Sequence, residues 1–295
     1  MKRGIRHVAR DISYSSAMSS KGGRALVRVM ENATGRLGLI KRVQGYDVEV
    51  ANGRDFWQVM TERYNLDLRI ISGRLANIPS EGPLVVVSNH PFGILDGLMM
   101  GRILSERRSG DFKVMAHQVF RRSADLERVI LPIHFDETKE AVRANLETRA
   151  EAVRYLKNGG CVGIFPGGTV STAENRTARP LDPVWRNFTA KMVAKSGATV
   201  VPIYFDGHNS KLFQIASRLN YTLRMGMLIR EFKTRVDMPV DVGIGEPIGP
   251  DVLAQFRSDP KAMMDLLRKA TYDLSPEPVA ANGIGFEFEA KYRKQ

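Results

Sequence analysis

The sequence predicts an α/β fold: a mostly parallel central sheet covered by helices, preceded by a basic, amphipathic helical arm. From residue 66 onward, short β-branched or apolar runs alternate with helix-patterned stretches, which is typical of a parallel sheet. The first 45 residues hold ten Lys and Arg but only two acidic residues. No internal repeat or linker divides the rest of the chain. We therefore expect an arm over residues 1–65 and one α/β domain over residues 66–295.

Two amphipathic helices make up the predicted arm. In residues 24–43, apolar side chains recur at helical spacing and Lys or Arg fills the other face, with Gly35 and Gly38 as interruptions. Residues 55–64 predict a second helix with aromatic anchors. This composition is typical of helices that lie in a membrane interface. The alternative is that the same helices pack on the main domain.

The positive charge indicates an anionic partner. The formal net charge is +12, and two thirds of it lies in residues 1–45. Lipid headgroups and an acidic carrier protein are the candidates, and nucleic acid is the weaker one because the arm has few aromatic rings for base stacking. No apolar run approaches the ~20 residues that span a bilayer, and the basic start lacks the apolar core of a secretory signal. We expect a peripheral protein on the cytoplasmic face of the inner membrane.

The other elements follow from periodicity and turn residues. The clearest helix covers residues 137–157, where apolar residues repeat on one face and Gly159-Gly160 ends the pattern. Residues 211–235 mix apolar and basic side chains, which predicts either a second membrane-facing surface or a core helix followed by a strand. The remaining expected helices are residues 97–106, 187–196 and 251–273, and the expected strands are residues 66–71, 85–87, 112–116, 129–133, 161–165, 199–205 and 240–244.

The most informative stretch follows the strand at residues 85–87, where His90 is followed six positions later by Asp96. Open α/β sheets place their chemistry at the carboxyl ends of strands. Gly93 lets the chain fold back between the two residues, so the carboxylate can reach the imidazole. A histidine held by a carboxylate is a general base for a hydroxyl or an amine. The alternative is that Asp96 only caps the next helix and His90 is a structural loop residue.

Three further segments at strand ends or turns can converge on this pair. The turn Gly167-Gly168-Thr169 exposes backbone amides that could stabilise an oxyanion. Arg121 and Arg122 could hold an anionic headgroup or the phosphate of a carrier. Asn209 is a candidate acceptor contact, with a turn cap as the alternative. These groups are the ones that acyl transfer needs.

Two absences from the sequence narrow the chemistry. There is no Gly-x-Ser-x-Gly nucleophile elbow, which favours direct transfer over an acyl-enzyme intermediate. Cys161 is the single cysteine, so thiolate zinc sites are excluded, and no spaced set of ligands surrounds His208. We therefore expect no metal site and no cofactor.

The four segments, in this order, resemble the glycerolipid and lysophospholipid acyltransferases, the superfamily of the 1-acylglycerol-3-phosphate acyltransferases. The resemblance covers roughly residues 84–247 and rests on the joint occurrence of all four segments. It implies transfer of a fatty acyl group from acyl carrier protein or coenzyme A to a lyso-lipid at the membrane face. The family motifs fall on His90 and Asp96, on Arg122 or alternatively Arg121, on Phe165-Pro166-Gly167-Gly168, and on Pro202.

Two departures from the family pattern bear on the acceptor. The spacing between His90 and Asp96 is one residue longer than in the family, and Gly167 replaces the Glu of the third motif. Both features are similar to the hemolysin-like branch, which includes enzymes that acylate lyso-ornithine lipids. The resemblance therefore implies O-acylation of a lyso-aminolipid of the ornithine-lipid type. The alternatives are a lysophosphatidic acid acyltransferase and a non-catalytic protein that binds lipid or carrier.

Overall fold

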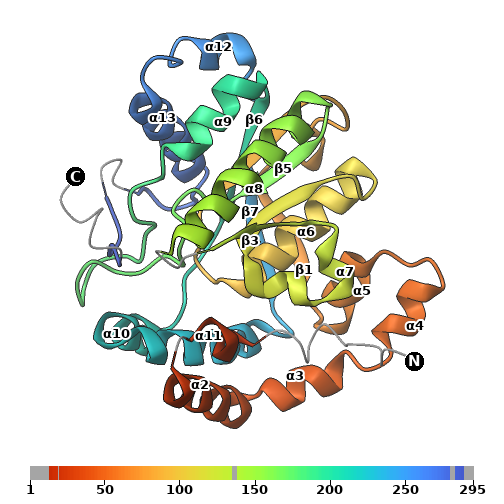
Figure 1. Cartoon of the computed structure of the whole chain (residues 1–295), viewed down its shortest axis with the longest axis vertical. Coiled ribbons are helices and arrows are strands. Elements are labelled where there is room, and N and C mark those ends of the chain that lie inside the picture. Colours follow the sequence, from red (N-terminus) through yellow and green to blue (C-terminus); the bar gives the residue numbers. More distant parts are fainter. Residues whose placement is uncertain (1–12, 19, 135–137, 280–282, 289–295) are drawn as a thin grey trace.

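The central sheet contains seven strands within the part of the chain that the computed structural model describes, namely residues 13–18, 20–134, 138–279 and 283–288 (Figure 1). The strand order is β1-β7-β6-β2-β5-β3-β4, and every neighbouring pair is parallel except β6 and β7. The predicted mostly parallel α/β fold is confirmed. The strands are β1 Asp67–Gly73, β2 Leu84–Ser88, β3 Lys113–His117, β4 Ile130–Ile133, β5 Cys161–Ile164, β6 Thr199–Phe205 and β7 Pro239–Ile244.

Strand β2 lies in the middle of the sheet and separates two hydrophobic cores. Successive side chains of a strand point to opposite faces, so Leu84 and Val86 enter one core while Val85 and Val87 enter the other. The first core contains residues of α5 (Phe56–Arg63), α6 (Ile94–Arg108) and α11 (Tyr221–Arg235). The second contains residues of α8 (Lys139–Lys157), α9 (Phe188–Ser196), α12 (Pro250–Ala254) and α13 (Pro260–Tyr272).

The arm is packed onto the α/β domain. Its first helix pair, α2 (Lys21–Thr34) and α3 (Arg36–Arg42), is broken at Gly35, where φ is +127°. At that φ a residue with a side chain would be strained, so the predicted interruption is a glycine effect. Val27 of α2 is buried in a third cluster with residues of α10 (Lys211–Leu219) and α11, and Leu39 of α3 belongs to the first core. The short α4 (Tyr46–Ala51) leads from there to α5.

Residues 211–235 form two helices, so the alternative of a core helix followed by a strand is wrong. Asn220 separates α10 from α11, and its side chain accepts hydrogen bonds from the amides of Thr222 and Leu223 at the start of α11. Helices α2, α10 and α11 lie together at the end of the molecule opposite α12 (Figure 1). They present the strongly exposed apolar side chains Leu26, Val29, Leu212 and Leu219.

The remaining elements are short turns of helix. They are η1 (Tyr14–Ala17), η2 (Leu75–Asn77), η3 (Gln118–Arg122) and α7 (Ala124–Glu127). Arg121 and Arg122 are therefore the last two residues of a 3₁₀ turn. In the described ranges, every helix is too short or too polar to cross a membrane.

Candidate active site

His90 and Asp96 meet at the carboxyl end of β2. Nδ1 of His90 is 2.9 Å from Oδ2 of Asp96, whose side chain is fully buried. The same oxygen accepts hydrogen bonds from the amides of Phe92 and Gly93, at 2.9 and 2.8 Å. Asp96 is the third residue of α6, and Gly93, with φ of +94°, makes the turn that precedes the helix. The carboxylate therefore ties down the start of α6 and faces the imidazole at the same time.

The backbone of His90 is held on both sides. Its amide donates to Oδ1 of Asp182 at 3.1 Å, and its carbonyl accepts from the amide of Ser171 at 2.7 Å. The imidazole stacks on the ring of Phe165, with the centroids 4.2 Å apart. The preceding residue, Asn89, pairs with the backbone of Phe205 through its side-chain amide, which ties the end of β2 to the end of β6.

Asp182 is a buried carboxylate that sequence reasoning missed. Besides the His90 amide it accepts hydrogen bonds from the hydroxyl of Ser171 and from the indole nitrogen of Trp185. Burial raises the pKa of its carboxyl group above the usual range, although these hydrogen bonds oppose the rise. The sequence shows only an aspartate within an apolar stretch, and nothing in that stretch reveals its distant partners.

The third-motif turn packs against this carboxylate. A Cβ atom on Gly167 would lie 3.2 Å from Cβ of Asp182, which is tighter than ordinary van der Waals contact. Gly168 has φ of +70°, and its amide donates to the carbonyl of Phe165 at 2.9 Å, which closes the turn. Within the described residues, the amide of Thr169 finds no hydrogen-bond acceptor. Thr169 therefore offers a backbone donor next to His90.

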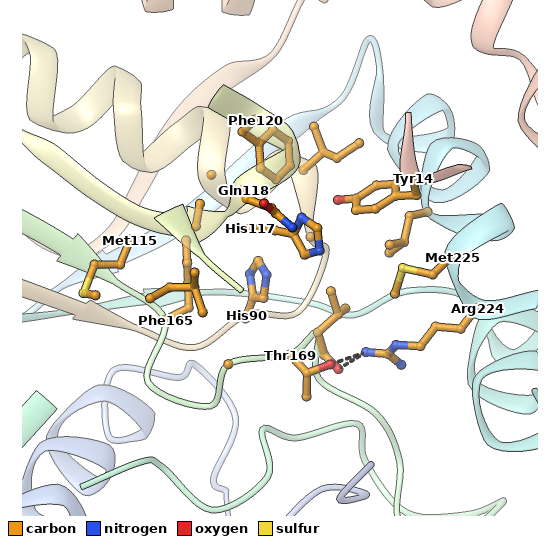
Figure 2. A pocket seen from close by; sticks show the side chains of 18 of the residues that line it. Tyr14, His90, Met115, His117, Gln118, Phe120, Phe165, Thr169, Arg224 and Met225 are labelled. Carbon is orange, nitrogen blue, oxygen red and sulfur yellow. Dashed lines mark hydrogen bonds between the residues drawn. The ribbon is translucent and has the colours of Figure 1, made fainter. Parts of the chain in front are cut away.

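Arg224 of α11 is a second residue that the sequence did not single out. It is 1 % exposed and donates to the Thr172 hydroxyl at 2.7 Å, the Thr169 hydroxyl at 2.9 Å and the Val170 carbonyl at 2.7 Å. The guanidinium carbon lies 4.2 Å from the ring centroid of Phe288. Burial lowers the pKa of Arg224 to about 9. Figure 2 shows the guanidinium directed at Thr169 beside His90.

One cavity of about 1430 Å³ joins these groups. Its lining includes His90, Phe165, Gly168, Thr169 and Arg224 (Figure 2). Apolar side chains come from both cores, because the cavity lies at the strand ends, where the two faces of the sheet meet. They include Trp57, Met60 and Phe232 from the first core and Met115, Ile164 and Phe188 from the second.

The N-terminal segment also contributes to the cavity wall. Tyr14 lines the cavity, and its amide donates to Oε1 of Glu31 at 2.8 Å. Burial raises the pKa of the Tyr14 hydroxyl above its usual range. The predicted arm therefore supplies part of the candidate site as well as an external surface.

Three predicted substrate-binding residues lie differently from the rest. Arg121 is exposed and is not part of the cavity lining, and the side chain of Arg122 lies outside the described residues. Asn209 is buried, and its side-chain amide donates to the carbonyl of Phe92 at 3.4 Å, so it supports the loop that carries His90. Direct substrate contact by these three residues stays a prediction.

Comparisons with known proteins are consistent with this geometry. Residues 69–206 match the family model described as Acyltransferase. Lyso-glycine lipid O-acyltransferase of Bacteroides thetaiotaomicron is 26% identical over 208 residues, which cover 66% of this chain and 71% of that protein. The protein of the same name from Phocaeicola vulgatus is 23% identical over 202 residues, which cover 66% of this chain and 69% of that protein.

Among solved structures, the 1-acyl-sn-glycerophosphate (LPA) acyltransferase PlsC from Thermotoga maritima is similar, with a TM-score of 0.46 and 17% identity. The alignment covers 88% of this chain and 83% of that one. The family match itself spans β1 to β6 and includes His90, Asp96 and the third-motif turn. Over residues 69–206, this chain is similar to the Acyltransferase family.

Proposed function

We propose that this protein transfers a fatty acyl group from a carrier thioester to the hydroxyl of a lyso-aminolipid, with His90 as general base. The observation that carries the proposal is the 2.9 Å contact between His90 and a buried Asp96 in the wall of a largely apolar cavity. The family match supports acyl transfer, and the two curated relatives are named as lipid O-acyltransferases. The donor is acyl carrier protein or coenzyme A.

The proton path follows from the orientation of the imidazole. With Nδ1 facing Asp96, the hydrogen is carried on Nδ1, and Nε2 is the basic nitrogen. Nε2 removes the proton from the acceptor hydroxyl as its oxygen attacks the thioester carbonyl. The buried carboxylate stabilises the imidazolium that forms.

The thioester carbonyl becomes an oxyanion in this step, and it requires preorganised donors. The Thr169 amide, which has no acceptor among the described residues, is suited to that role. Collapse of the tetrahedral intermediate breaks the C–S bond. The imidazolium then returns its proton to the thiolate, so the products are an ester and a free thiol, and His90 is again neutral.

The class of acceptor lipid is inferred from similarity to other proteins. The resemblance to the hemolysin-like branch favours an aminolipid, and the names of the two relatives specify a glycine head group rather than ornithine. We therefore propose a lyso-lipid whose amino acid is joined to its acyl chain through nitrogen. Such a head group keeps a carboxylate, and the acylated hydroxyl lies on the chain.

We also propose that the outer faces of α2 and α10 rest on an anionic membrane surface. Leu26, Val29, Leu212 and Leu219 are between 47% and 74% exposed, and Leu219 also lines the cavity. The same helices expose Lys21 and Lys211. Apolar anchors with basic neighbours suit a headgroup layer. A lipid acceptor could then enter the cavity without crossing water.

Vesicle sedimentation tests this surface. The double variant Leu212→Ser/Leu219→Ser should reduce binding to anionic vesicles, whereas Val252→Ser on α12, also exposed but at the opposite end, should bind like the wild type. Binding by the wild type should fall as salt rises, because the basic contribution is screened. Equal binding by all three proteins would remove this surface from the proposal.

Steady-state kinetics test the catalytic part. With an acyl thioester and an amino-acid lyso-lipid, His90→Gln should lower kcat by about 10²- to 10⁴-fold, the usual size of a general-base contribution. Asp96→Asn should also lower kcat, because the imidazole loses its charged partner. His208→Gln is the matched control, since His208 is exposed and lies outside the cavity lining. Full activity of His90→Gln would contradict the mechanism and favour a binding role.

A further inference from the structure

Arg224 is a buried cation without an anionic partner in the described part of the chain. It contacts two threonine hydroxyls, one backbone carbonyl and the faces of two aromatic rings, those of Phe213 and Phe288. Some other arginines of the protein do lie near a carboxylate. The buried Arg36 is 3.9 Å from Glu31, and the half-buried Arg186 is 2.9 Å from Glu287. A buried charge is costly unless it is paired, so a site that keeps one in the wall of a cavity suits an anionic ligand.

Arg108 shows that a buried arginine without a carboxylate partner can have a purely structural role. Arg108 is also buried and also lacks a carboxylate among the described residues, and it donates to the carbonyls of Pro79, Gly82 and Gly159. Arg108 lies outside the cavity lining, whereas Arg224 is part of that lining together with Thr169 and His90. The position of the charge, rather than its burial, distinguishes Arg224.

We propose that Arg224 binds the carboxylate of the acceptor's amino-acid head group and thereby selects acidic over neutral acceptors. This inference rests on the proposed function. A guanidinium carries five N–H donors. The contacts within the protein use both Nη2 hydrogens and one Nη1 hydrogen, which leaves Nε–H and the second Nη1 hydrogen for a carboxylate. In the cavity such a pair is screened less than in water.

The hydrogen bond from Arg224 to Thr169 connects the proposed head-group site to the catalytic residues. Thr169 accepts from Arg224 through its hydroxyl and belongs to the turn whose amide is suited to the oxyanion. The head group is then held at one end by Arg224 while its chain hydroxyl lies at His90. Figure 2 shows His90, Thr169 and Arg224 around the same space. Correct placement of the carboxylate therefore places the hydroxyl for proton transfer.

The experiment compares a negatively charged acceptor with a neutral one that differs from it by one methyl group. One is a lyso-lipid with a free glycine carboxylate, and the other is its methyl ester. The wild type should prefer the acid by roughly 10- to 100-fold in kcat/KM, the size of a charged hydrogen-bonded contact. Arg224→Met should abolish the preference through a higher KM for the acid and little change for the ester. Arg224→Lys, which keeps the charge, should retain part of it. Arg108→Lys is the matched control and should keep the full preference.

Each possible outcome either supports or overturns the proposed role of Arg224. An unchanged preference in Arg224→Met, or an equal loss with acid and ester, would overturn the inference and leave Arg224 as a structural residue. A raised KM for the thioester donor, with the acid preference retained, would assign Arg224 to the carrier's phosphate and overturn it as well. If Arg224→Met does not fold, Thr172→Val keeps the arginine but removes one hydroxyl that accepts from it, and it should weaken the acid preference while activity with the ester is retained. Acylation of neither compound by the wild type would refute the proposed function, whereas equal acylation of both would refute only the carboxylate site.

Discussion

The amide of His90 donates a hydrogen bond to Oδ1 of Asp182, 3.1 Å away, although the two residues are 92 positions apart in the sequence. Two buried carboxylates therefore hold this histidine. Asp96 faces the imidazole ring, and Asp182, which lies much later in the sequence, accepts a hydrogen bond from the backbone amide. Ser171 closes the arrangement, because its hydroxyl donates to Asp182 and its amide donates to the carbonyl of His90.

Replacement of Asp182 should impair catalysis through the position of His90. Asp182→Ala removes the acceptor for the His90 amide, and a displacement of the base by about 1 Å can cost about 100-fold in rate. We expect kcat to fall by roughly 10- to 100-fold while KM changes little. Ser171→Ala should have a smaller effect, because its amide still donates to His90. Steady-state kinetics at temperatures well below unfolding measure both. A proportional rise of KM, or an unchanged kcat, would speak against a positioning role.

Gly167 should be sensitive to the addition of a single methyl group. Its missing side chain leaves room for Asp182, so Gly167→Ala forces that carboxylate to move and should lower the free energy of unfolding by about 1 to 3 kcal/mol. Gly38→Ala, in a helix with open space around the new Cβ, should be neutral or stabilising by up to ~1 kcal/mol. Urea unfolding of the two variants gives the comparison. Equal stability of both would show that Asp182 does not require a glycine there.

The acid preference should disappear at high pH. Burial lowers the pKa of Arg224 to about 9, so the guanidinium is charged below that pH and neutral above it. The attraction for a head-group carboxylate is therefore present at pH 7 and lost as pH rises through about 9. The ratio of kcat/KM for the acid to that for the methyl ester should decline over this range in the wild type. A ratio that stays constant to pH 10 would contradict this pH dependence and show that the guanidinium keeps its proton over the range.

Local patterns determine what the sequence could reveal. Strand β2 and the pair His90 and Asp96 lie within a few residues of one another, so periodicity and spacing were sufficient to predict them. The placement of Asp182 and Arg224 depends on contacts between residues about 50 to 90 positions apart. Nothing nearby in the chain distinguishes Arg224 from the half-buried arginines of the same segment. Residues 211–235 were ambiguous for the same reason, since mixed apolar and basic side chains serve both a surface and a core.

The most direct test of the central claim is mass spectrometry of the lipids formed by the purified protein. The reaction contains an acyl thioester and a panel of lyso-lipids, with amino-acid and phosphate head groups together. The account predicts that the lyso-lipid with an amino-acid head group gains one acyl chain on its hydroxyl, and that His90→Ala forms none of this product. Acylation of lysophosphatidic acid instead, or full product formation by His90→Ala, would contradict it.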